Sequence, residues 1–285
     1  MGERRAQGDA TAAQKAMARL TSSASDRPKA KAARVTKVRN LSVGRPPLAP
    51  APLDVLNKLH HCDMLFAIDV KTHEVVQEKT SSWNQGQFGY KARVSTSTLR
   101  SLRVVQLGWA TGSLNAERPN ISKWTIEPEG FVISPEAAMK HDIPQDVATD
   151  KGRPLREALQ SMLTALLQCC AQGGRLVAHH IEFVAGILIE ELCRASLDDM
   201  RDSFASIVRG GICTMDPLMT TWVRKMTGVP GDYAVPMRLA DAVRGLRCGS
   251  KDPQAGHHTA AIDAVMCWHL CKDLALRCKQ LRDAA

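Results

Sequence analysis

FAIDVKT, residues 66–72, is the stretch on which the fold prediction rests. It overlaps the run Leu65–Val70, which has the length and the apolar composition of a buried β-strand. One carboxylate, Asp69, lies inside that run, and Lys71 follows two residues later. Because alternate residues of a strand face the same side, Asp69 and Lys71 are predicted to project from one face of the sheet.

Downstream of this strand, the hydrophobic pattern predicts more strands and then helices. Further strands are expected at 103–110, about 122–126 and 175–178, and a long loop at 78–102 separates the first two strands. Helices are expected at 155–170, 181–194 and 258–281, with weaker ones near 216–227 and 238–246. Strands first, followed by alternating strands and helices, predict an α/β fold in which helices pack on a mixed β-sheet.

Two other segments carry polar residues beside apolar ones. LVAHHIEFV, residues 176–184, places His179 and His180 where a predicted strand passes into a predicted helix. HHTAAIDA, residues 257–264, places His258 and Asp263 at the start of the last helix. Each segment alone has an ordinary structural explanation, such as a carboxylate that favours the first turn of a helix. The three segments together point to a functional site.

In combination, the three segments resemble the motifs of the DEDDh family of 3′-5′ exonucleases. The segment between them agrees, because Phe131–Ala137 and His141–Ile143 resemble the part of the family that precedes its first long helix. The resemblance covers nearly all of 62–275. It implies a ribonuclease-H-like mixed β-sheet flanked by helices, and hydrolysis of phosphodiester bonds with Mg²⁺ or Mn²⁺ as cofactor.

The motifs match the family at some positions and depart from it at others. Asp69 matches the first carboxylate and Asp263 the last, and both are candidate metal ligands. His258 matches the histidine that accepts a proton from the attacking water, so it is the candidate catalytic residue. Further matches are His179, Phe183 and Ala260, whereas the departures are Lys71 for a Glu, His180 for an Asn and Val184 for an Asp.

These departures remove half of the carboxylates that two metal ions require. In two-metal hydrolysis, clustered carboxylates hold the ions roughly 4 Å apart, and the resemblance implies four acids around them. Here Asp69 and Asp263 remain, with Lys71 beside Asp69, so the local charge is about −1. Glu182 and Glu74 are poorly placed to compensate, the first by helix geometry and the second because it follows the strand.

Charge is distributed unevenly along the chain. Residues 1–50 contain eleven basic and three acidic residues, a balance of +8 within a whole-chain net charge of +9. Residues 1–55 are therefore predicted to be a disordered, basic Ala/Arg/Pro-rich extension, and residues 60–282 the exonuclease-like domain. The extension has the composition of a transit peptide, of a nucleic-acid-binding arm or of a solvated linker. The nine cysteines lack a regular frame, which indicates a reducing intracellular compartment: mitochondrion or chloroplast with a transit peptide, otherwise cytoplasm or nucleus.

Three functional hypotheses remain open. The first is a protein that binds the 3′ end of single-stranded nucleic acid and whose hydrolytic activity is weakened or lost, with Lys71 and His180 adjacent to the substrate. The second is an active exonuclease with a rearranged metal site that uses Mg²⁺ or Mn²⁺. The third is a structural subunit of a ribonucleoprotein. No apolar run is long enough to predict a membrane partner, and the sequence does not identify protein partners or choose between DNA and RNA.

Overall fold

The computed structural model describes residue 59 and residues 62–76, 95–229, 237–248 and 258–283. The predicted basic extension, and all but the end of the predicted 78–102 loop, lie outside the described residues. Within the described ranges, no helix is both long and apolar enough to span a bilayer.

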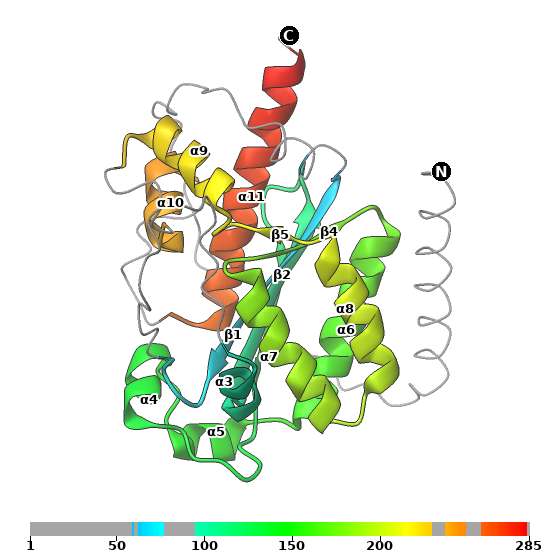
Figure 1. The fold of residues 1–285 in the computed structure, drawn as a ribbon, viewed down its shortest axis with the longest axis vertical. Helices are drawn as coiled ribbons and strands as arrows, with labels where there is room; N and C mark the ends of the chain where they lie inside the picture. Colours follow the sequence, from blue (N-terminus) through cyan, green and yellow to red (C-terminus); the bar gives the residue numbers. More distant parts are fainter. Residues whose placement is uncertain (1–58, 60–61, 77–94, 230–236, 249–257, 284–285) are drawn as a thin grey trace.

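A five-stranded mixed sheet forms the centre of the molecule (Figure 1). Its order is β3-β2-β1-β4-β5, with β1 (Met64–Thr72) in the middle. β2 (Val104–Ser113) pairs antiparallel with β1, and β3 (Asn120–Thr125) pairs antiparallel with β2. β4 (Arg175–Ala178) runs parallel to β1, and the short β5 (Ile212–Cys213) runs parallel to β4. The predicted mixed sheet is thus confirmed.

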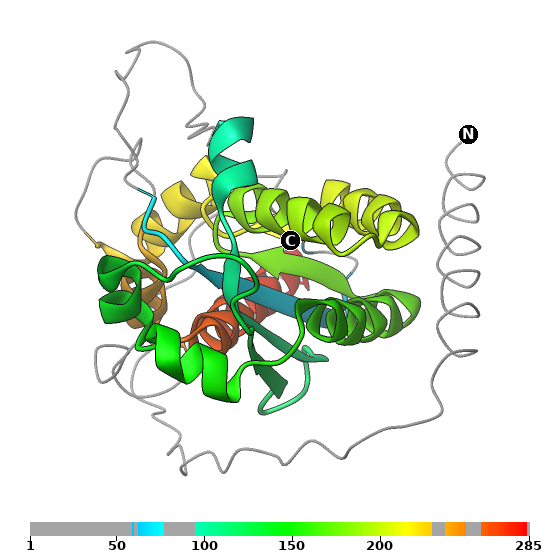
Figure 2. The same ribbon diagram turned by 90° about the horizontal axis from the view of Figure 1, so that it is seen from below.

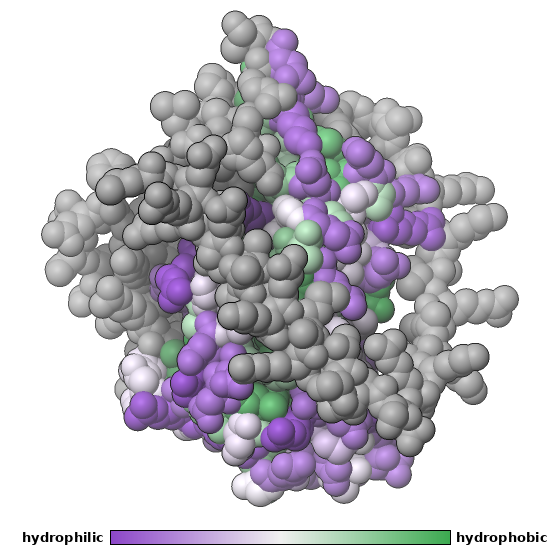
Figure 3. Space-filling view, turned by 90° about the vertical axis from the view of Figure 1, so that its right-hand side faces the viewer, coloured by the Kyte–Doolittle hydropathy of each residue, from purple (hydrophilic) through white to green (hydrophobic). Residues whose placement is uncertain are grey.

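Helices cover both faces of the sheet (Figures 1 and 2). One face carries α11 (Ala260–Asp283), with α9 (Pro217–Thr227) and α10 (Leu239–Leu246) packed beside it. The opposite face carries α6 (Leu155–Ala171), α7 (Ile181–Arg194) and α8 (Asp198–Arg209). The chain is therefore a three-layer α/β fold. On one side of the molecule, the described residues present mostly hydrophilic side chains with scattered apolar ones (Figure 3).

The alternation of β1 side chains decides which residues face which layer. Leu65 and Ala67 belong to the apolar cluster under α11, whereas Phe66, Ile68 and Val70 belong to the cluster under α6 and α7. By the same alternation Asp69 and Lys71 follow Leu65 and Ala67, and so face α11. The functional side chains of β1 thus point towards the helix that carries Asp263.

Several elements were not predicted. They are α3 (Thr96–Ser101), α4 (Pro135–His141), α5 (Gln145–Lys151), α8 and β5. The predicted loop is wrong at its end, because Ser95 caps α3 by accepting a hydrogen bond from the Thr98 N–H. The last helix begins at Ala260 rather than at His258.

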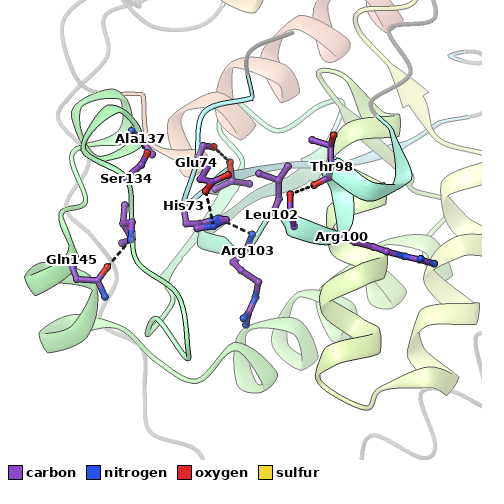
Figure 4. Close-up of polar contacts among 12 residues, drawn as sticks. His73, Glu74, Thr98, Arg100, Leu102, Arg103, Ser134, Ala137 and Gln145 are labelled. Carbon is purple, nitrogen blue, oxygen red and sulfur yellow. Dashed lines mark hydrogen bonds and ion pairs between the residues drawn. The ribbon is translucent and has the colours of Figure 1, made fainter. Parts of the chain in front are cut away.

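A network of polar contacts fixes the end of β1 just beyond Lys71 (Figure 4). The His73 N–H donates to the Arg103 carbonyl at 3.0 Å, and the Arg103 N–H donates back to His73 Nδ1 at 3.1 Å. The Ser134 N–H donates to the His73 carbonyl at 2.8 Å, which ties α4 to the same point. Buried Glu191 of α7 accepts the Val104 N–H at 2.8 Å and pairs with Arg103 at 3.2 Å. These contacts hold α7 and α4 against the strand end that carries the site.

Candidate functional site

The candidate site lies where the carboxyl ends of the parallel strands β1 and β4 meet the first turn of α11. Two β2 residues hold α11 there: the Gln106 side chain accepts the Ala260 N–H at 2.8 Å, and Gly108 allows close approach. A Cβ on Gly108 would lie 2.3 Å from the backbone nitrogen of Ala261. The start of α11 therefore rests directly on the sheet, which places Asp263 opposite β1.

The ammonium group of Lys71 lies between the carboxylates of Asp69 and Asp263. Lys71 Nζ is 2.8 Å from Asp69 Oδ2, and it also donates a hydrogen bond to Asp263 Oδ2. The three side chains are only 17%, 17% and 14% exposed for Lys71, Asp69 and Asp263. One cation is thus shared by two carboxylates in a partly desolvated site.

The environment shifts the pKa values of this group. Burial raises the pKa of Asp69 to about 6; Lys71 opposes this rise, and Asp263 adds to it. Burial by itself would lower the pKa of Lys71, but the two carboxylates hold it above its ordinary value. Lys71 therefore stays charged at physiological pH.

The three candidate histidines have different surroundings. His258 is more than half exposed, and its Nδ1 lies 3.3 Å from Asp263 Oδ1. His179 contacts Thr214 Oγ1 through Nδ1 at 2.8 Å, and burial lowers its pKa to about 4, with His180 as a smaller cause. His180 has a left-handed backbone with φ of 69° and stacks on Phe183. Asn and His tolerate this conformation better than most residues do.

The position at which the resemblance implies a further carboxylate, residue 184, is apolar. Val184 is 3% exposed and packs in the cluster under α6 and α7. Glu182 and Glu74 are exposed, and neither lines the cavity beside Asp69. The structure thus brings Asp69, Lys71, His258 and Asp263 together without a further carboxylate from these positions.

The residues present do not fit the two metal ions that the resemblance implies. A cation already bridges the two remaining carboxylates. Across the described part of the chain, no group of three or more His, Cys, Asp and Glu side chains is arranged to hold a metal ion. The donor set around Asp69 and Asp263 is therefore too small for a two-metal centre.

A cavity of about 280 Å³ opens beside this group. Its lining includes Asp69, His179, His258 and Asp263, and its other wall comes from α10 and the residue before it, with Arg238, Asp241 and Arg244. The α10 residues could not be selected from the sequence, since that helix is predicted only as a weak pattern. The same holds for Gln106, Gly108 and Thr214, for which no local motif gives a signal.

No family model matches the chain, and no curated protein matches it in sequence. Solved structures match in fold. E. coli exonuclease I with a dT13 oligonucleotide has a TM-score of 0.55 at 12% identity, covering 78% of this chain and 43% of that chain. The complex of the same enzyme with a dA16 oligonucleotide has a TM-score of 0.54 at 13% identity, covering 78% of this chain and 42% of that chain. A zinc-bound E. coli exonuclease I–ssDNA complex has a TM-score of 0.50 at 12% identity, covering 78% of this chain and 41% of that chain.

These similarities establish the class of fold. The chain has the ribonuclease-H-like exonuclease fold, which confirms the predicted fold class. It spans less than half the length of these exonuclease I chains. At such low identity the likeness concerns the fold alone.

Proposed function

We propose that this protein binds the 3′ end of single-stranded nucleic acid. We propose further that the protein's capacity to hydrolyse the strand is weakened or lost. The observation that carries the proposal is the Lys71 ammonium seated between Asp69 and Asp263. A divalent ion at that place would have to displace a cation that both carboxylates hold. The same ammonium removes the dense negative charge that would otherwise repel a phosphate in the absence of metal ions.

Two further observations support the binding of a strand end in this cavity. The cavity beside Asp263 opens at the carboxyl ends of β1 and β4, where open α/β sheets commonly bind ligands. Two of the solved structures that match this chain in fold are exonuclease I bound to dT13 and dA16 oligonucleotides. His258, which is more than half exposed at the cavity, is accessible to such a ligand.

The alternative is an active exonuclease with a rearranged site. The observation in its favour is the 3.3 Å contact between His258 and Asp263, which keeps an imidazole next to a carboxylate. A neutral imidazole can accept a proton from water. Such an enzyme would shorten strands with Mg²⁺ or Mn²⁺, and Asp69→Ala or Asp263→Ala would abolish the reaction.

The deciding experiment combines binding and cutting on the full chain. A 5′-labelled single strand is titrated with protein in EDTA, and its length is then followed with Mg²⁺ or Mn²⁺ for the wild type and for Lys71→Glu with Val184→Asp. We expect the wild type to bind without cutting, and the double variant to gain metal-dependent cutting. Absence of binding at moderate salt refutes the proposal, and metal-dependent cutting by the wild type supports the alternative.

A further inference from the structure

The cavity has a second wall whose chemistry the family resemblance does not account for. This wall is formed by Arg238 and by the α10 residues Leu239, Ala240, Asp241 and Arg244. Ala240, Asp241 and Arg244 are spaced at three and four residues, so they share one face of the helix, and all three line the cavity. Two arginines therefore line the same cavity as the carboxylates Asp69 and Asp263.

Among the described residues, every Asp and Arg side chain that lines the cavity has an oppositely charged partner except Arg238. Lys71 forms ion pairs with both Asp69 and Asp263, and Asp241 Oδ1 pairs with Arg244 Nη1 at 3.0 Å. That last pair is weak, because its side chains are 46% and 40% exposed. Arg238 is exposed and pairs with no carboxylate among the described residues. An anion entering the cavity thus meets one unpaired guanidinium and another that is held only loosely.

The remaining lining suits one nucleotide rather than a length of strand. The cavity volume of about 280 Å³ is near the lower end of small-molecule sites, roughly 300–1,000 Å³. Met266 and Leu239 give it an apolar part, next to the charged part. A ligand with an apolar ring system and a single phosphate combines both features.

We propose that Arg238 and Arg244 form a metal-independent phosphate site for one nucleotide unit. This inference rests on the proposed function and extends it by naming the residues that bind the phosphate. The planar guanidinium fork donates paired hydrogen bonds to phosphate oxygens. The phosphate belongs either to the end of a single strand or to a free nucleoside monophosphate, since both offer the same group.

The test measures fluorescence anisotropy of a 5′-labelled oligothymidylate with the full chain in EDTA. The variants are Arg238→Ala, Arg244→Ala, both together, and Arg244→Lys, which keeps the charge but not the fork. Arg209→Ala is the matched control, since Arg209 is exposed at the end of α8 and does not line the cavity. Deoxythymidine monophosphate and inorganic phosphate serve as competitors, and thermal unfolding of each variant verifies its fold.

We expect each alanine variant to weaken binding about tenfold and to lower the salt dependence by about one counterion. The Arg209 control is expected to bind as the wild type does. Competition by the monophosphate indicates that a free nucleotide is also accepted. An arginine effect without such competition assigns the site to the strand end. Both results support the phosphate site.

Other outcomes separate this inference from the proposed function. If the wild type binds single strands and the folded double variant binds them equally well, the arginine site is refuted while strand binding stands. If the wild type binds the monophosphate through these arginines but no strand, the proposed function fails and the phosphate site stands. Binding of neither ligand refutes both.

Discussion

Lys71→Met tests the electrostatic arrangement at the centre of the site. The substitution keeps much of the side-chain volume and removes the charge that Asp69 and Asp263 share. At an effective dielectric constant of about 20, the attraction across the 2.8 Å between Lys71 and Asp69 is about 6 kcal/mol before desolvation is subtracted. Loss of one partner from such a partly buried pair commonly lowers the free energy of unfolding by about 3–5 kcal/mol.

The pH dependence of this loss follows from the pKa of Asp69. That pKa is raised to about 6, with burial as the main cause. A carboxyl group whose pKa is raised on folding favours the folded state below its ordinary pKa, and this contribution is lost as the pH rises through about 6. Without Lys71 the pKa rises further. At pH 5, where Asp69 is largely protonated, the variant loses mainly the contact between Lys71 and Asp263. The loss of stability should therefore be smaller at pH 5 than at pH 8.

Urea unfolding at the two pH values measures the effect, with Lys123→Met as the matched control, because Lys123 is exposed on β3. Thermal unfolding with MnCl₂ adds a second measurement. Two carboxylates without their ammonium are expected to bind the ion, which stabilises by about 2.7 kcal/mol at a hundredfold excess over the dissociation constant. The wild type should not respond. Equal stability of Lys71→Met at pH 8, with no response to manganese, would refute the reasoning.

Substitutions at three further positions test the buried contacts of α7, β2 and α11. Glu191→Ala should lower the free energy of unfolding, measured in urea, by about 3–5 kcal/mol. Glu191→Gln should lower it by less, because the amide oxygen still accepts the Val104 N–H. Equal losses in the two variants would contradict this. Gly108→Ala should push α11 off β2, since the new Cβ would lie 2.3 Å from the Ala261 nitrogen, and unchanged strand binding by anisotropy would contradict this. Burial, and secondarily Lys272, lowers the pKa of His269 to about 4, so stability should fall by up to about 3 kcal/mol between pH 6.5 and 4. His269→Gln should remove that part of the acid loss, and an identical pH profile would oppose it.

Strong periodicity explains which elements could be predicted. The helices at 155–171 and 181–194 and the strand at 175–178 were predicted to within a residue, because each buries a continuous apolar face. α8 was missed although Met200, Phe204, Ile207 and Val208 recur at helical spacing and pack in the cluster under α6 and α7. α4 and α5 have seven residues each and begin around Pro135 and Pro144, too short for a periodic signal.

The two halves of the candidate site also differ in how far the sequence could predict them. The group around Asp69 was predictable because strand alternation and three motifs constrain it. The wall formed by α10 depends on how Ala242, Val243 and Leu246 pack beneath α11. That packing joins residues far apart in the chain, and no motif encodes it. Arg238 and Arg244 therefore became visible only in the folded structure.

Lys71 and Val184, which stand where the resemblance implies carboxylates, are better understood as one electrostatic change than as two separate losses. A single ammonium, Lys71, pairs with both carboxylates of the partly buried group and lowers its net charge to about −1. A carboxylate at position 184 would be almost fully buried in an apolar cluster, since Val184 is 3% exposed, and without metal ions no cation would remain to match it. Burial of an unpaired charge is strongly unfavourable. Once Lys71 supplies the positive charge, an apolar residue at 184 is what the charge balance favours, and the phosphate proposed at Arg238 would then meet a site that repels it less.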